Sequence, residues 1–206
     1  SNQPRMAVGY SVMGTLGVLN ALGVLHIDAQ HVNQATAFIR SLHIQFGADA
    51  DGETNTAKQL ATTLQPYIPV LISAEHLIGP THVFGNQLNE NSKQFSVRFH
   101  IPELNHHLIE GLRFPNEGLR HLHAVFFTST LYNERNQKRF AVTQQLFEQN
   151  HISSLTVPLH AATRLEQVFE LLTMGSYASL YLAIAHGIDP SPIPNIDALK
   201  KALKDS

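Results

Sequence analysis

Residues 68–73 read IPVLIS, a short apolar and partly β-branched run just after Pro66. It shows no alternation of polar and apolar side chains, which is typical of a parallel strand buried on both faces of a sheet. Gly79 and Pro80 then introduce a helical pattern that continues to about residue 95. A buried strand followed directly by a helix predicts a unit of an α/β fold.

The same alternation continues to the end of the chain. Further strands are expected at residues 97–101, 122–127 and 155–157, and further helices at residues 133–149, 164–185 and 196–203. Strands separated by helices pair in parallel, with the connecting helices packed on the faces of the sheet. We therefore predict an α/β fold of three layers, a mostly parallel sheet flanked by helices on both faces.

The first 65 residues are predicted to be helical. Helices are expected over residues 6–25, 30–46 and 54–64, and the apolar composition of residues 6–25 predicts a helix buried on most sides. No repeat, low-complexity tract or linker divides the chain. Residues 1–206 are therefore expected to form a single domain.

The overall composition favours a globular domain with a full core. Hydrophobic residues make up 43% of the chain and charged residues 15%, with a net charge of −2 and no cysteine. The charge gives no basic footprint, so nucleic acid is not an expected partner. The longest apolar region, residues 12–25, is broken by glycines and is too short to span a membrane. A cytoplasmic protein with no membrane contact is expected.

The 13 histidines raise the question of a metal site. They are scattered without an accompanying acidic residue at regular spacing, and no thiolate is available. His106 and His107 are adjacent, a spacing that rarely turns two side chains toward one ion. We expect no metal and no other cofactor.

The helix expected after Gly79 has two contrasting faces. One face carries the apolar residues Leu77, Phe84, Leu88 and Phe95, and the other carries His82, Asn86, Asn89, Glu90 and Lys93. The apolar stripe is expected to cover the sheet. The polar face has two possible interpretations, a solvated surface or a functional one.

Residues 102–106, PELNH, follow directly on the strand expected at residues 97–101. Ligands of parallel α/β sheets bind at the carboxyl ends of the strands, where loops converge. His106 is therefore a candidate for a functional side chain, because its imidazole titrates near neutral pH.

Taken together, NENSK at residues 89–93 and PELNH at residues 102–106 resemble the bifunctional phosphoglucose/phosphomannose isomerases. The resemblance extends to YLAIAHGIDP at residues 181–190, IDALK at 196–200 and the opening Pro4-Arg5. It covers the second half of such an enzyme. It therefore implies a C-terminal sugar-isomerase (SIS) domain, without the N-terminal SIS domain whose Ser/Thr-rich loops hold the sugar phosphate.

The resemblance also implies roles for individual residues. Glu90 corresponds to the base that moves a proton between C1 and C2 through a cis-enediolate, and Arg5 to the arginine that stabilises this intermediate. His106 corresponds to the ring-opening histidine, which acts in the active site of the neighbouring subunit. Lys200, or Lys201 one position later, corresponds to the lysine that assists at the ring oxygen.

Two further residues are implied as substrate-binding, Asn89 in the NEN motif and Ser191. A small residue near position 191 would leave room for both C2 epimers. The implied enzyme is a phosphosugar isomerase of glycolysis and gluconeogenesis. It would be a homodimer that converts glucose 6-phosphate, and mannose 6-phosphate, to fructose 6-phosphate. The chain alone is expected to have little or no activity, because the phosphate-binding domain is missing.

A second function remains open, a non-catalytic SIS module that senses sugar phosphates or mediates dimerisation. A fold by itself does not decide function. An upstream SIS domain in the full polypeptide would favour the enzyme, and an upstream helix-turn-helix would favour the regulator. The presence of Glu90, His106 and Lys200 favours the enzyme, because a sensor needs no acid–base residues.

Overall fold

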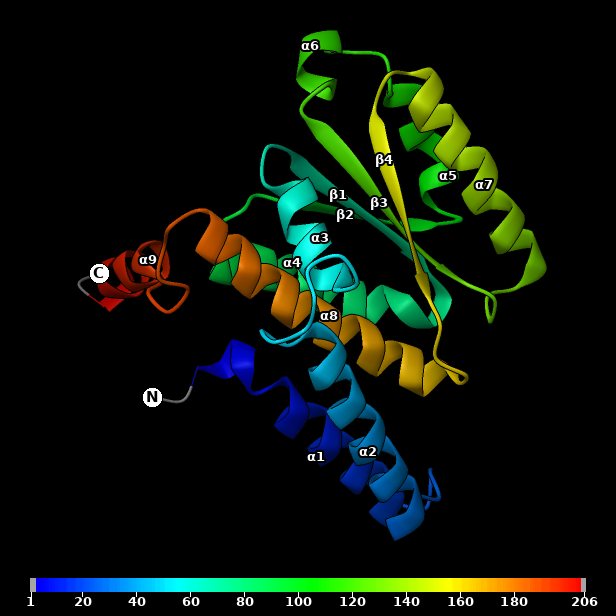
Figure 1. The fold of residues 1–206 in the computed structure, drawn as a ribbon, viewed down its shortest axis with the longest axis vertical. Helices are drawn as coiled ribbons and strands as arrows, with labels where there is room; N and C mark the ends of the chain where they lie inside the picture. Colours follow the sequence, from blue (N-terminus) through cyan, green and yellow to red (C-terminus); the bar gives the residue numbers. More distant parts are fainter. Residues whose placement is uncertain (1–2, 205–206) are drawn as a thin grey trace.

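The computed structural model describes residues 3–204, and strands alternate with helices from residue 68 onward (Figure 1). The strands are β1 (Ile68–Ala74), β2 (Val97–Ile101), β3 (Leu122–Ser129) and β4 (Ser153–Leu159). The longer helices are α1 (Val8–Ala21), α2 (Ala29–Phe46), α3 (Thr56–Leu64), α4 (Ile78–Asn91), α7 (Glu134–Gln149), α8 (Arg164–Ala185) and α9 (Pro194–Lys204). The short ones are η1 (Pro4–Met6), η2 (Glu75–Leu77), α5 (Leu104–His107), η3 (Leu108–Gly111) and α6 (Asn116–Leu119).

The strands form one parallel sheet in the order β2-β1-β3-β4. Strand β1 lies inside the sheet, and its apolar run is buried from Val70 to Ala74 because helices cover both of its faces. The predicted strand boundaries agree with the observed ones to within two residues. The predicted fold class is confirmed.

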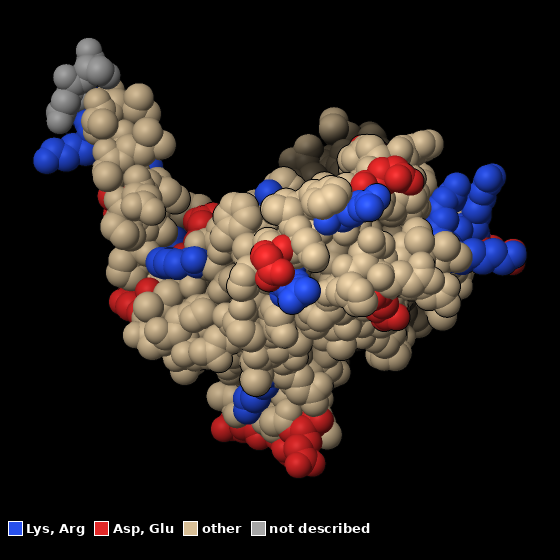
Figure 2. Space-filling model, turned by 90° about the horizontal axis from the view of Figure 1, so that it is seen from above, with Lys and Arg blue, Asp and Glu red and all other residues tan. Residues whose placement is uncertain are grey.

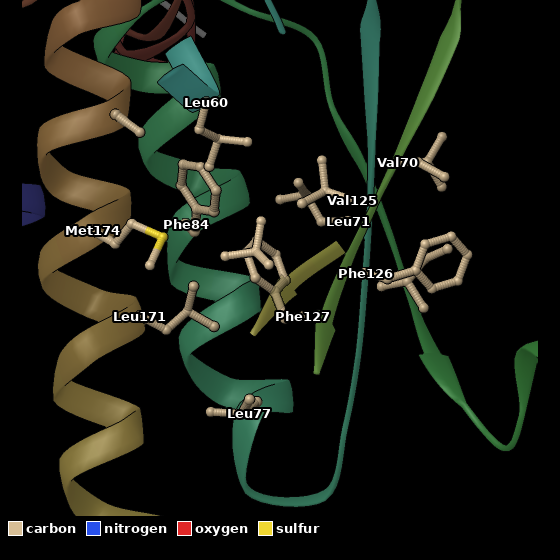
Figure 3. Close-up of a cluster of buried hydrophobic side chains, with 14 of the residues drawn as sticks. Leu60, Val70, Leu71, Leu77, Phe84, Val125, Phe126, Phe127, Leu171 and Met174 are labelled. Carbon is tan, nitrogen blue, oxygen red and sulfur yellow. The ribbon is translucent and has the colours of Figure 1, made fainter. Parts of the chain in front are cut away.

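Helices cover both faces of the sheet, and β3 shows how one strand serves both. Consecutive side chains of a strand point to opposite faces. Phe127 therefore packs against Phe84 of α4, whereas Phe126 packs against Phe140 and Phe147 of α7. Figure 3 shows Phe126 and Phe127 on opposite sides of the strand. Helices α3 and α8 join α4 on its side, and α5 and α7 lie on the other (Figure 1).

Helix α8 packs tightly against α4, α3 and α2. The contact with α4 depends on Gly175, since a Cβ at that position would lie 2.8 Å from Cδ2 of Phe84. By length and composition alone α8 could also cross a membrane, a feature that the sequence analysis missed. Half of its most apolar window is buried among these helices, which is the environment of a core helix.

Helix α1 departs from the prediction. None of its residues is buried, and Tyr10 and Val18 are 85% and 59% exposed. The expectation of a helix buried on most sides is therefore wrong for this chain. An exposed apolar surface is typical of a face that packs against another part of a protein or another chain. Residues 3–204 do not cover this face of α1.

The end of α4 also differs from the prediction. The helix stops at Asn91, and Lys93 adopts a left-handed backbone conformation with φ of 55° that turns the chain toward β2. Phe95 consequently lies beyond the helix and is 66% exposed, so it does not extend the apolar stripe.

On the face shown in Figure 2 most charged side chains are scattered among uncharged residues, apart from a group of basic side chains at the right edge, and no basic stripe crosses the face. Helix α9 stands apart from the sheet and its covering helices, and none of its residues is buried (Figure 1).

Candidate active site

Glu90 lies in the last turn of α4, with its side chain 35% exposed. Its Oε2 atom is 3.8 Å from Nη1 of Arg5, which is carried by η1 near the start of the chain. The fold thus brings together the acidic and the basic residue that the resemblance implies for proton transfer and for stabilisation of negative charge. Their roles remain predictions.

The guanidinium of Arg5 is held by several acceptors. Its side chain is only 6% exposed. Nε donates to Oδ1 of Asn91 at 2.8 Å, and Nη2 donates to the carbonyls of Pro190 and Ser191 at 3.0 and 2.6 Å. These acceptors are neutral, so the positive charge is solvated by dipoles and has the carboxylate of Glu90 as its nearby counter-charge.

The amide of Asn91 links Arg5 to helix α8. Asn91 is 4% exposed, and its Nδ2 donates to Oγ of Ser179 at 3.0 Å. The Ser179 hydroxyl in turn donates to the carbonyl of Ser176 at 3.0 Å. A chain of hydrogen bonds therefore runs from η1 through α4 into the core helix.

Lys93 secures the segment that connects α8 to α9. Its Nζ donates to the carbonyls of Glu90 and Pro190 at 2.7 and 3.1 Å, so Pro190 accepts from both Lys93 and Arg5. Partial burial and the charge of Arg5 lower the pKa of Lys93. The backbone amide of Ser191, and more weakly Lys93, lower the pKa of Asp189.

A cavity of about 380 Å³ lies next to this cluster. Asn91, Tyr177, Leu180 and Pro190 contribute to its walls, so it is bounded by α4, α8 and the segment after α8. Its volume is within the range of small-molecule sites. Arg5 and Glu90 do not themselves line the cavity, which shares Asn91, Pro190 and Ser191 with the cluster.

His106 lies far from this cluster in the same chain. It belongs to α5, after the carboxyl end of β2, and is exposed. Glu90 lies before the amino end of β2, and a strand of five residues spans about 15 Å. The chain alone therefore does not bring His106 to Glu90. Its neighbour His107 instead contacts Glu103, and this hydrogen bond lowers the pKa of Glu103.

The remaining predicted residues are placed as follows. Lys200 is exposed on α9, as is Lys201, and neither forms an ion pair with Glu90. Asn89 is exposed on α4, and its Oδ1 accepts from Oγ of Ser96 at 3.2 Å. Ser191 does belong to the cluster, because its carbonyl accepts from Arg5 and its amide donates to Asp189 at 2.8 Å.

The part played by Asn91 was not predicted from the sequence, and Lys93 was expected only as a residue of the polar face. A signal for Asn91 was present. It follows Leu88 by three residues and Phe84 by seven, so it falls on the buried stripe of the helix. A polar amide at a buried position needs hydrogen-bond partners. Among residues 3–204, no group of three or more His, Asp or Glu side chains is arranged to hold a metal ion.

The chain is thus a three-layer α/β domain with a parallel sheet, in which a carboxylate and a buried guanidinium meet at the end of α4. Comparison with known proteins agrees with this fold class and also identifies the family. The chain belongs to the family described as "Bacterial phospho-glucose isomerase C-terminal SIS domain", whose model matches residues 53–203. The resemblance noted in the sequence is confirmed.

Curated relatives are named "Bifunctional phosphoglucose/phosphomannose isomerase". The protein from Caldicellulosiruptor bescii is 30% identical over 98% of this chain and 60% of its own length. That from Aquifex aeolicus is 24% identical over 98% of this chain and 59% of its own length. The chain thus spans about 60% of the length of the relatives it matches.

Solved structures share the fold. A glucose-6-phosphate isomerase like protein from Thermus thermophilus superposes with a TM-score of 0.64 at 24% identity, covering 76% of this chain and 52% of that one. A hypothetical protein from the same organism gives a TM-score of 0.69 at 11% identity, covering 83% and 49%. At these identities the similarity concerns the fold alone.

Proposed function

We propose that the protein containing this chain isomerises glucose 6-phosphate, and mannose 6-phosphate, to fructose 6-phosphate. The observation that carries the proposal is the 3.8 Å approach of the partly exposed Glu90 carboxylate to the buried Arg5 guanidinium. Aldose–ketose isomerisation needs a base that moves a proton between adjacent carbons and a positive charge near the oxygen that becomes negative. The names of the curated relatives support the same reaction.

In the proposed reaction, the Glu90 carboxylate removes the proton from C2 of the open-chain aldose. The electron pair of the C–H bond forms the C1–C2 double bond, and the carbonyl pair moves to O1 to give a cis-enediolate. The proton on O2 shifts to O1, and Glu90 returns its proton to C1, which leaves a carbonyl at C2. Arg5 stabilises the negative charge on the oxygens between the two proton transfers.

The ring of the cyclic substrate must open first, and we assign this step to His106 of a second copy. Within one chain His106 and Glu90 lie at opposite ends of β2. A homodimer in which α5 of one copy approaches α4 of the other would bring imidazole and carboxylate together. Lys200, exposed on α9, would assist at the ring oxygen.

The substrate phosphate would be held by a preceding SIS domain of the same polypeptide. Two observations support this domain. The chain covers only about 60% of its curated relatives, and the apolar helix α1 has no buried residue. In this proposal Asn89 and Ser191 complete the substrate site, and the isolated chain has little or no activity. The enzyme is expected in the cytoplasm.

The test is Glu90→Gln in the full-length protein, assayed on glucose, mannose and fructose 6-phosphates. Because the amide cannot accept the C2 proton, kcat should fall by about 10²- to 10⁴-fold while the fold survives. Glu117→Gln is a matched control. Glu117 also lies near an arginine, Arg120 at 3.9 Å, but belongs to α6, away from α4.

Turnover by Glu90→Gln close to that of the unmodified protein would refute the role of Glu90. A full-length protein that binds 5-phosphoarabinonate, a mimic of the enediolate, without isomerising any of the three sugars would refute the enzyme. That result would instead support the non-catalytic sugar-phosphate module.

A further inference from the structure

We infer that Asn91, held by Ser179 behind it, is a positioning residue that fixes the Arg5 guanidinium so that its Nη1 edge faces the reacting oxygens beside Glu90. The inference rests on the proposed isomerase function and adds two residues to it. It starts from the hydrogen bond between Arg5 Nε and Asn91 Oδ1.

The geometry of the guanidinium carries the first step. The group is planar and its five N–H donors have fixed directions. Nε is engaged by Asn91, and Nη2 by the carbonyls of Pro190 and Ser191. Two acceptor directions within one plane fix both the position and the tilt of the group. Nη1 lies 3.8 Å from the Glu90 carboxylate. Its donors therefore face the place where an oxygen bound next to Glu90 would lie.

The Asn91 side chain is held in one orientation. Its amide could in principle be rotated so that nitrogen and oxygen exchange places. Rotation would direct Nδ2 at Arg5 Nε, two donors facing each other, and would break the bond from Nδ2 to Ser179 Oγ. Ser179 is fully buried, and its own proton goes to the carbonyl of Ser176. The hydroxyl oxygen is therefore left as the acceptor that holds the amide in place.

A comparison within the same helix separates this role from simple helix packing. Gln87 lies one turn before Asn91, is similarly buried at 3% exposure, and its Nε2 donates to Oγ of Ser176 at 2.8 Å. Both amides thus join α4 to α8 through a serine. The amide oxygen of Asn91 accepts from Arg5, whereas the amide oxygen of Gln87 has no hydrogen-bond partner among residues 3–204.

The experiment compares Asn91→Ala with Gln87→Ala in the full-length protein. Both variants should lose thermal stability, because each removes one buried amide between the same helices, and Asn91→Ala should lose more, because it also leaves Nε of Arg5 without its acceptor. Asn91→Ala should also lower kcat by about 10- to 100-fold, because misplacing a transition-state donor by about 1 Å has effects of that size. Gln87→Ala should change kcat by less than about threefold, since its amide does not contact Arg5. Affinity for 5-phosphoarabinonate should fall in parallel with kcat.

A double-mutant cycle shows whether Asn91 acts through Arg5. If it does, Asn91→Ala should have no further effect on kcat in a protein that already carries Arg5→Ala. Ser179→Ala, at a residue with no hydrogen bond to Arg5 or Glu90, should give an intermediate loss. It also serves as the test if Asn91→Ala does not fold.

The outcomes separate the two proposals. If the unmodified protein does not isomerise sugar phosphates, the proposed function fails and the inference falls with it. If the unmodified protein and Gln87→Ala turn over, the inference alone is overturned by equal kcat values for Asn91→Ala and Gln87→Ala. Additive losses in the double-mutant cycle would overturn it as well.

Discussion

The two ends of β2 are built in contrasting ways. Before its amino end, Arg5, Asn91 and Ser179 are joined by hydrogen bonds across three elements and their side chains are buried, so the position of each is fixed within the chain. Beyond its carboxyl end, His106 is exposed on a four-residue helix. Under the proposed function, one part of the site is complete within the chain, whereas the part that contains His106 would be completed by another surface.

The largest expected effect tests whether the two ends belong to one site. His106→Ala in the full-length protein should lower kcat by about 10²- to 10⁴-fold on cyclic substrates, the range for loss of an acid–base group. Mixed with Glu90→Gln after subunit exchange, it should regain activity. About half of the dimers would be mixed, and one of the two sites in each would be intact, which gives about a quarter of full activity.

Absence of any recovery, with mixed dimers demonstrated by mass spectrometry, would contradict the assignment of His106 to the neighbouring subunit. Full activity of His106→Ala alone would remove His106 from the site. Either result would break the comparison between the two ends of β2.

A smaller effect is expected from a comparison of helix α8, which packs in the core, with helix α1, which has no buried residue. Gly175→Ala should destabilise the chain by about 1–3 kcal/mol, because its Cβ would overlap Phe84. Gly17→Ala in α1 meets nothing within 4 Å and should be neutral, or stabilising by up to about 1 kcal/mol, in the isolated chain. Urea denaturation measures both. Destabilisation by Gly17→Ala would mean that α1 is covered even in the isolated chain.

The smallest effect concerns His123, a buried histidine. His123 is 7% exposed, and burial lowers its pKa below 6.5. The folded state then binds fewer protons than the unfolded state. The contribution of His123 to the free energy of unfolding should therefore be fully present above pH 6.5 and should decline as the pH falls toward the folded pKa. His123→Gln should flatten the dependence of Tm on pH below pH 6.5. A dependence of Tm on pH that is the same for His123→Gln and for the unmodified chain would contradict this view.

Much of the fold could be predicted because a strand that is buried on both faces of a sheet is recognisable as a continuous apolar run in the sequence. The run at residues 68–73 predicts β1, and the 22-residue periodic stretch predicts α8 with the boundaries that are observed. The end of α4 was harder to predict, because Lys93 takes a left-handed backbone conformation that few non-glycine residues adopt. The expected burial of α1 was wrong. An apolar composition indicates that a helix favours a covering surface, but it does not show that the chain itself supplies that surface.

The sequence by itself determined the order of the strands and of the longer helices and, through its motifs, the membership of an isomerase family. Both follow from patterns within a few neighbouring residues, where helix and strand periodicities are expressed. Only the tertiary structure decided that Arg5 meets Glu90 and Asn91, and that His106 does not. Those distances depend on how η1, α4 and α8 pack in three dimensions, and no local pattern encodes the separation of residues so far apart in the chain.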